Sequence, residues 1–133
     1  EGHVMTIQTG DKPIYHAAAV IASNFFVSII DMSLKLYEAI GIDPEKGLEA
    51  LLPLISGSLA NISELGPVKA LTGPIARGDA GVVQNHLDAI ARVVPEFLPA
   101  YKALAHLNVG VGLRKGTLTE ERGKAILALV KQQ

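Results

Sequence analysis

The feature that most constrains the fold is a long apolar stretch without helix breakers. After Pro13, no glycine or proline occurs until Gly41, so a single helix of about 28 residues, roughly 40 Å long, can form. Asp11 and Lys12 precede that proline, and an aspartate cap followed by proline suits a helix start. Residues 17–30 are apolar on nearly every side, a pattern typical of a helix that is buried on most faces.

The same stretch falls short of the usual length of a membrane span. Its apolar run is about 14 residues and contains Ser23, Asn24 and Ser28, whereas a bilayer span needs about 20 apolar residues. We therefore expect a buried core helix and no membrane partner.

Turn and cap signals divide the remaining chain into further helices. The sequence predicts four more helices. Two of them begin with a proline, Pro44 or Pro95, and two begin after a capping residue, Asp79 or Thr119. We expect a kink or a break at Pro53, because proline removes a helical hydrogen bond.

Two segments are not predicted to form long helices. Residues 66–79 are rich in glycine and proline and predict a loop with one helical turn. Residues 4–9 alternate weakly and carry β-forming side chains, which predicts a short strand. The fold class we predict is all-α: about five helices packed round one long hydrophobic helix, with a short N-terminal strand stub.

Composition excludes several classes of function. The 133 residues suit one domain, and the net charge of −1 with 5% aromatic residues gives no basis for nucleic-acid binding. The chain has no cysteine, so disulfide, iron–sulfur, thiolate zinc and cysteine-nucleophile chemistry are excluded. Its four histidines lack metal-site spacing, and we expect no metal. A cysteine-free chain without a signal peptide is compatible with the cytoplasm.

Polar residues interrupt the long apolar helix on one side. At 100° per residue, His16 and Ser23 lie about 20° apart and His16 and Asn24 about 80° apart, so all three can border one cleft. Leaving such groups buried and unpaired costs about 1–3 kcal/mol each. They either hydrogen-bond neighbouring helices or line a polar cavity.

A second candidate site is the sequence Thr-Gly-Pro-Ile-Ala-Arg-Gly-Asp at residues 72–79. A hydroxyl from Thr72, main-chain N–H groups near Gly73, and the Arg77 guanidinium suit an anion such as a carboxylate or phosphate. The alternative is an interhelical loop in which Arg77 pairs with Asp79 or a carbonyl oxygen.

Several motifs together resemble a helical C-terminal domain of unknown function that follows a Rossmann-like NADP-binding domain in a group of bacterial oxidoreductases. The resemblance covers roughly residues 12–131, and the string at residues 72–79 is its most specific part. The other motifs are Tyr15-His16-Ala17-Ala18-Ala19-Val20, Ala22-Ser23-Asn24, Leu51-Leu52-Pro53-Leu54, Asn61, Gly66-Pro67, Ala70-Leu71 and His86-Leu87.

The layout of such proteins is similar to that of pyrroline-5-carboxylate reductase, ketopantoate reductase and 6-phosphogluconate dehydrogenase. It implies that residues 1–11 are a linker or strand stub from a preceding nucleotide domain, and that residues 12–133 form the helical domain. NADP would be bound mainly by that preceding domain and not by this chain alone. The implied partners are the nucleotide domain, a second copy in a homodimer, and a small anionic substrate.

The resemblance also implies roles for individual residues. His16 would donate or accept a proton, Asn24 would hold a substrate oxygen or the nicotinamide amide, and Arg77 would hold a substrate carboxylate. The remaining substrate-binding candidates are Tyr15, Ser23, Thr72 and Gly73. The hydroxyacid dehydrogenases place a lysine four residues before the helix asparagine, whereas this chain has Val20 there, which argues against lysine-driven chemistry.

The resemblance predicts a substrate-cleft and dimerisation domain of an NADP-dependent oxidoreductase that has no activity by itself. The alternative is a free-standing helical module that binds a protein partner or senses a small molecule.

Overall fold

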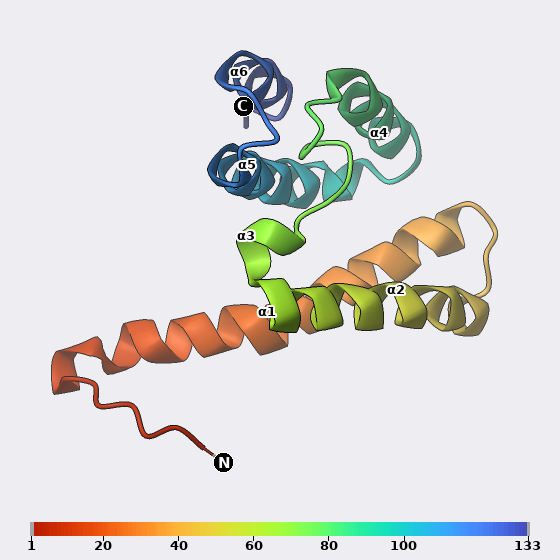
Figure 1. The fold of residues 1–133 in the computed structure, drawn as a ribbon. Coiled ribbons are helices and arrows are strands. Elements are labelled where there is room, and N and C mark those ends of the chain that lie inside the picture. The colour runs from red at the N-terminus through yellow and green to blue at the C-terminus, as the bar shows by residue number, and fades with distance from the viewer. Residues whose placement is uncertain (1, 133) are drawn as a thin grey trace.

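The computed structural model describes residues 2–132, and these residues form an all-α fold without strands, as predicted (Figure 1). Two single-turn 3-10 helices accompany six α-helices. The elements in chain order are η1 (Thr9–Asp11), α1 (Lys12–Ala39), α2 (Pro44–Leu65), α3 (Pro67–Ala70), α4 (Ala80–Val93), η2 (Pro95–Phe97), α5 (Leu98–Lys115) and α6 (Glu120–Leu129).

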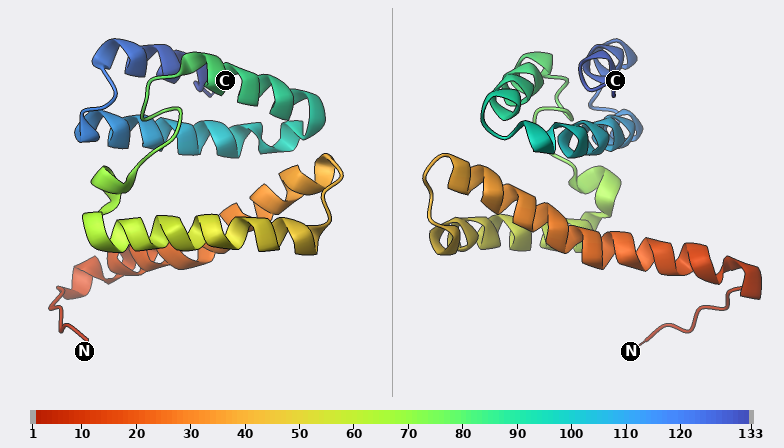
Figure 2. Two further views of the ribbon diagram at one scale, coloured as in Figure 1. Left: turned by 45° about the vertical axis from the view of Figure 1, so that its right-hand side comes forward. Right: turned by 180° about the vertical axis from the view of Figure 1, so that it is seen from behind.

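The helices are arranged in two parts. Helices α1 and α2 form a long hairpin, and α4, α5 and α6 form a separate three-helix body (Figures 1 and 2). The short helix α3 packs against both α2 and α5 and connects the hairpin to the body. The loop at residues 71–79 then leads from α3 to α4.

The hydrophobic core lies in the three-helix body. Val83 of α4, Val109 of α5 and Ile126 of α6 are almost completely buried against one another's helices. Each such side chain contributes about 1.5–3 kcal/mol through burial. The loop adds Ile75, and the segments after α5 and α6 add Leu118 and Val130.

The long apolar helix is not at the centre of the fold, so that part of the prediction is wrong. Helix α1 has the predicted 28 residues, but none of them is buried. Ile21 and Val27, for example, are 60% and 67% exposed. Apolarity on all sides shows that a helix needs cover, but it does not show that the cover comes from the same chain.

The predicted N-terminal strand is also wrong. Residues 2–8 have no regular secondary structure, and the single-turn helix η1 follows them. Gln8 has extended backbone angles, but an extended segment becomes a strand only when a neighbouring segment accepts and donates its backbone hydrogen bonds. The described residues offer this segment no such neighbour.

Most helix boundaries agree with their sequence signals. The Asp43 carboxylate accepts from the amides of Glu45 and Lys46, and Asp79 and Thr119 cap α4 and α6. Asp11 makes no side-chain cap bond to α1. Helix α2 continues through Pro53 without a break, since that residue lies on an exposed face, where water can satisfy the freed carbonyl group.

Candidate functional site

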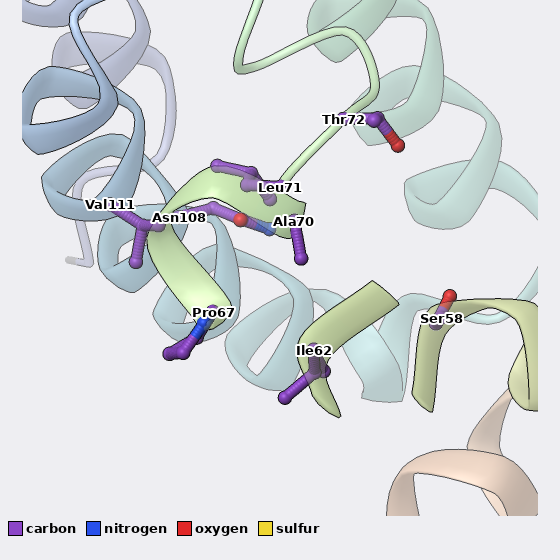
Figure 3. A pocket seen from close by; sticks show the side chains of 8 residues that line it. All are labelled: Ser58, Ile62, Pro67, Ala70, Leu71, Thr72, Asn108 and Val111. Atoms are coloured by element: carbon purple, nitrogen blue, oxygen red, sulfur yellow. The ribbon is translucent and has the colours of Figure 1, made fainter. Parts of the chain in front are cut away.

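A partly polar pocket of about 380 Å³ lies where α2, α3 and α5 meet. Three uncharged polar side chains line it: Ser58 from α2, Thr72 from the loop after α3, and Asn108 from α5 (Figure 3). The other lining residues are apolar, namely Ile62, Pro67, Ala70, Leu71 and Val111. Such a lining can accept or donate several hydrogen bonds to a ligand without adding charge.

Two local features fix the geometry of this pocket. Gly66 turns the chain sharply between α2 and α3 with φ 79° and ψ 161°, a conformation essentially restricted to glycine. The ammonium group of Lys115 then donates to the main-chain oxygens of Lys69, at 3.1 Å, and Leu71. These bonds satisfy carbonyl groups at the end of α3 and hold the start of the loop that carries Thr72.

The loop at residues 72–79 is held in place by buried side chains in its middle. Ile75 and Ala76 are buried, while Gly73 and Gly78 supply positive φ angles of 98° and 71°. The Asp79 carboxylate accepts from the Val82 amide at 3.1 Å. The buried middle and the capped end give the loop a defined shape.

Arg77 extends from this loop into solvent. Its main-chain oxygen accepts a hydrogen bond from Nη1 of Arg122 at 3.3 Å. Within residues 2–132 its guanidinium makes neither an ion pair with Asp79 nor a side-chain hydrogen bond. The pairing that would make Arg77 a simple loop anchor is therefore not formed, and the guanidinium is accessible to an anion.

The four candidate residues on α1, Tyr15, His16, Ser23 and Asn24, are all exposed. The Ser23 hydroxyl donates to the Ala19 main-chain oxygen at 2.7 Å and lies 3.1 Å from Oδ1 of Asn24. Of the two expected alternatives, hydrogen bonding of Ser23 to a neighbouring helix is not formed within the described residues, and its hydroxyl pairs within α1 itself. These contacts leave the Asn24 amide nitrogen and the His16 ring facing solvent.

The structure separates the predicted site residues into two groups. The N-terminal half of α1 extends away from the body (Figures 1 and 2), whereas Thr72, Gly73 and Arg77 lie on the loop that connects α3 to α4. Thr72 lines the pocket described above. None of the five main cavities formed by residues 2–132 combines side chains from the two groups. A cleft that contains both the α1 residues and the loop residues stays a prediction, and it would require assembly of the chain with other protein.

Sequence reasoning missed Ser58 and Asn108. Asn108 interrupts an apolar run in the middle of a helix, between Leu107 and Val109, and a polar residue in such a run is the signal that could have indicated it. Ser58 follows Ser56 and Gly57 and gives no such signal.

One further polar pair joins two helices of the body. The Nδ1 atom of His86 on α4 lies 2.9 Å from the Tyr101 hydroxyl on α5, with the rings edge to face. Burial raises the pKa of the Tyr101 phenol above its ordinary value. No group of three or more residues that could hold a metal ion occurs in the part of the chain that the structure describes.

Comparison with known proteins gives one match. A family model described as a domain of unknown function (DUF2520) matches residues 1–107. No curated protein and no solved structure matches the chain.

Proposed function

The chain belongs to the DUF2520 family, and from that premise we propose that it is the substrate-cleft and dimerisation domain of an NADP-dependent oxidoreductase of the cytoplasm. The proposed partners are a Rossmann-like nucleotide domain and a second copy of the chain. The domain is inactive alone in this proposal, because the reaction also needs the nucleotide domain.

The observation that carries this proposal is the uncovered apolar hairpin. The chain exposes 9568 Å², whereas a compact monomer of its mass, 14.0 kDa, exposes about 6,700 Å². Most of its exposed large apolar side chains lie on α1 and α2. Apolar surface on this scale is typical of a domain that packs against other protein.

The chain's own residues do not fit the dinucleotide. A dinucleotide site needs a glycine-rich turn between a strand and a helix; the sequence lacks such a turn, and residues 2–132 form no strand. The proposal therefore assigns the dinucleotide to the nucleotide domain. It assigns only contacts with the substrate to this chain.

Within the proposed cleft, the accessible residues have distinct roles. Arg77 binds a substrate carboxylate through two hydrogen bonds, with Thr72 and Gly73 beside it on the loop. His16 transfers a proton near neutral pH. Asn24, Ser23 and Tyr15 orient a substrate oxygen. What supports these roles is that the Arg77, His16 and Asn24 side chains are exposed.

The test uses the longest open reading frame that contains this chain. NADPH oxidation is measured with a panel of small 2-oxo and imino acids, for the wild type, Arg77→Ala and His16→Ala. Arg77→Ala should raise KM at least tenfold with little change in kcat, and His16→Ala should lower kcat. Arg114→Ala, an exposed arginine outside the site, is the matched control. Activity unchanged in both site variants contradicts the assigned roles.

A second function, sensing of a small molecule, is favoured by the pocket at Ser58, Thr72 and Asn108. Its lining offers hydrogen-bonding groups but no charge, which suits a neutral polar ligand. This alternative predicts that ligands raise the melting temperature of the wild type but not of Asn108→Leu, and that no hydride transfer accompanies binding.

A further inference from the structure

The helical hairpin carries two unpartnered apolar features. The first, which we call the arm, is residues 13–21 of α1; Ile14 and Ile21 on it are 71% and 60% exposed. The second, which we call the groove, is a cavity of about 710 Å³ between α1 and α2. Its apolar lining includes Phe26, Ile30 and Leu59.

The arm and the groove have matching chemistry. Residues 13–30 contain no aspartate, glutamate, lysine or arginine, and no such residue lines the groove. An occupant of the groove must therefore be apolar and uncharged over the length that it buries, because a buried unpaired charge is costly. The arm is a helical segment with this property.

The arm cannot enter the groove of its own chain. Both belong to the same uninterrupted helix α1, and the arm extends beyond the segment that borders α2 (Figure 2). We therefore propose that the arm of a second copy docks in the groove, reciprocally, so that α1 and α2 of two copies form the centre of a symmetric dimer. This inference rests on the dimerisation part of the proposed function and names its surface.

The exposed area agrees with such a dimer. The chain exposes 9568 Å², about 2,900 Å² more than a compact monomer of this mass. Residues 2–8, which lack regular structure, account for about 1,100 Å² of it at the exposure of an unfolded chain. The remaining excess of about 1,800 Å² per copy lies in the range of obligate dimer interfaces. A reciprocal contact also uses the same surface on both copies, so the assembly is complete with two copies.

The alternative to a second copy is a lipid bilayer that covers this apolar surface. By length and composition, the helical segment Thr9–Ala39 could cross a bilayer, and none of its most apolar window is buried. However, α2 packs along α1 and carries Glu45, Lys46, Glu49 and Glu64, all exposed. Immersing the hairpin would move these charges into lipid, whereas a protein dimer can leave them at its rim.

The experiment measures the mass of the chain by light scattering and its dissociation constant by sedimentation. Ile21→Glu on the arm and Leu59→Glu in the groove place a charge at residues that are 60% and 65% exposed. The control, Leu107→Glu, changes an equally exposed residue, 66%, on α5 of the body. Circular dichroism verifies that each variant keeps its helices.

The expected result is a dimer of twice 14.0 kDa for the wild type and for Leu107→Glu. Both hairpin variants should dimerise at least tenfold more weakly. The inference is overturned by a wild-type monomer at micromolar concentration, by a hairpin variant that dimerises like the wild type, or by co-flotation of the wild type with phosphatidylcholine–phosphatidylglycerol vesicles. A dimer without NADPH-dependent activity in the longer protein would contradict the oxidoreductase proposal and leave this surface assignment standing.

Discussion

The ammonium group of Lys115 at the end of α5 lies 3.1 Å from the main-chain oxygen of Lys69, at the end of α3. The same group also donates to Leu71. The two residues are far apart in sequence, and their contact joins the C-terminal ends of two helices. Because α3 connects the hairpin to the body, this contact holds the hairpin, the pocket and the loop in one arrangement.

Lys115→Met should therefore destabilise the chain by about 1–2 kcal/mol, since it leaves the partly buried carbonyl group of Leu71 without its charged donor. Chemical denaturation followed by circular dichroism measures the loss. Arg114→Met, at the exposed neighbouring position, is the control and should change stability by less than about 0.5 kcal/mol. Equal effects of the two variants would show that the Lys115 contact does not stabilise the chain.

Two glycines should respond in opposite directions to alanine. Gly78 has φ +71°, and an added Cβ would lie 2.6 Å from Cδ of Arg122, so Gly78→Ala should cost about 1–2 kcal/mol. Gly57 lies inside α2 with nothing within 4 Å of an added Cβ, so Gly57→Ala should stabilise by about 0.5–1 kcal/mol. Thermal unfolding of both variants measures the difference. A destabilised Gly57→Ala would contradict the open surroundings of that position.

The predictions made from local signals were mostly confirmed. Aspartate and threonine caps, proline starts and glycine-rich turns act within a few residues, so the starts of α2, α4 and α6 could be located from sequence. The placement of α1 could not. Uniform apolarity specifies that a helix is covered but not by which molecule, and the covering surface is absent from the single chain.

The candidate site was predicted only in part for a related reason. Thr72 and Arg77 belong to one loop and were singled out because their chemistry is concentrated in a few consecutive residues. Ser58 and Asn108 reach the pocket that Thr72 lines from helices distant in sequence, and the turn at Gly66 and the Lys115 contact help to bring them together. A single cleft that contains both the candidate residues of α1 and those of the loop would form only when the chain assembles with other protein. That cleft stays a prediction.

The core in the three-helix body gives a third prediction. Ile126 is 0% exposed, so Ile126→Ala should cost about 2–5 kcal/mol through lost burial and a cavity. Leu107→Ala, at a residue 66% exposed on the same body, should cost much less. Urea unfolding compares the two. A small effect of Ile126→Ala would contradict the placement of the core in the body.

Tyr101 gives a prediction in alkaline solution. Burial raises the pKa of its phenol above the ordinary value of 10.0, so the folded chain holds this proton more tightly than the unfolded chain. That stabilisation is complete below about pH 10 and is lost as the pH rises through the raised pKa. Tyr101→Phe removes the proton, so its stability should fall less steeply than that of the wild type above about pH 10. If the free energy of unfolding falls equally steeply with pH above about 10 in the two proteins, the burial effect is contradicted.

Covering of the apolar hairpin by a second copy can be measured directly, because the chain has no cysteine of its own. Ile21→Cys on the arm and Leu107→Cys on the body, at positions of similar exposure, are each labelled with a thiol reagent over a range of protein concentrations. We predict that the arm cysteine reacts slowly at high concentration and becomes fast on dilution, while the body cysteine reacts fast throughout. Equal rates at the two positions at every concentration would contradict the proposal.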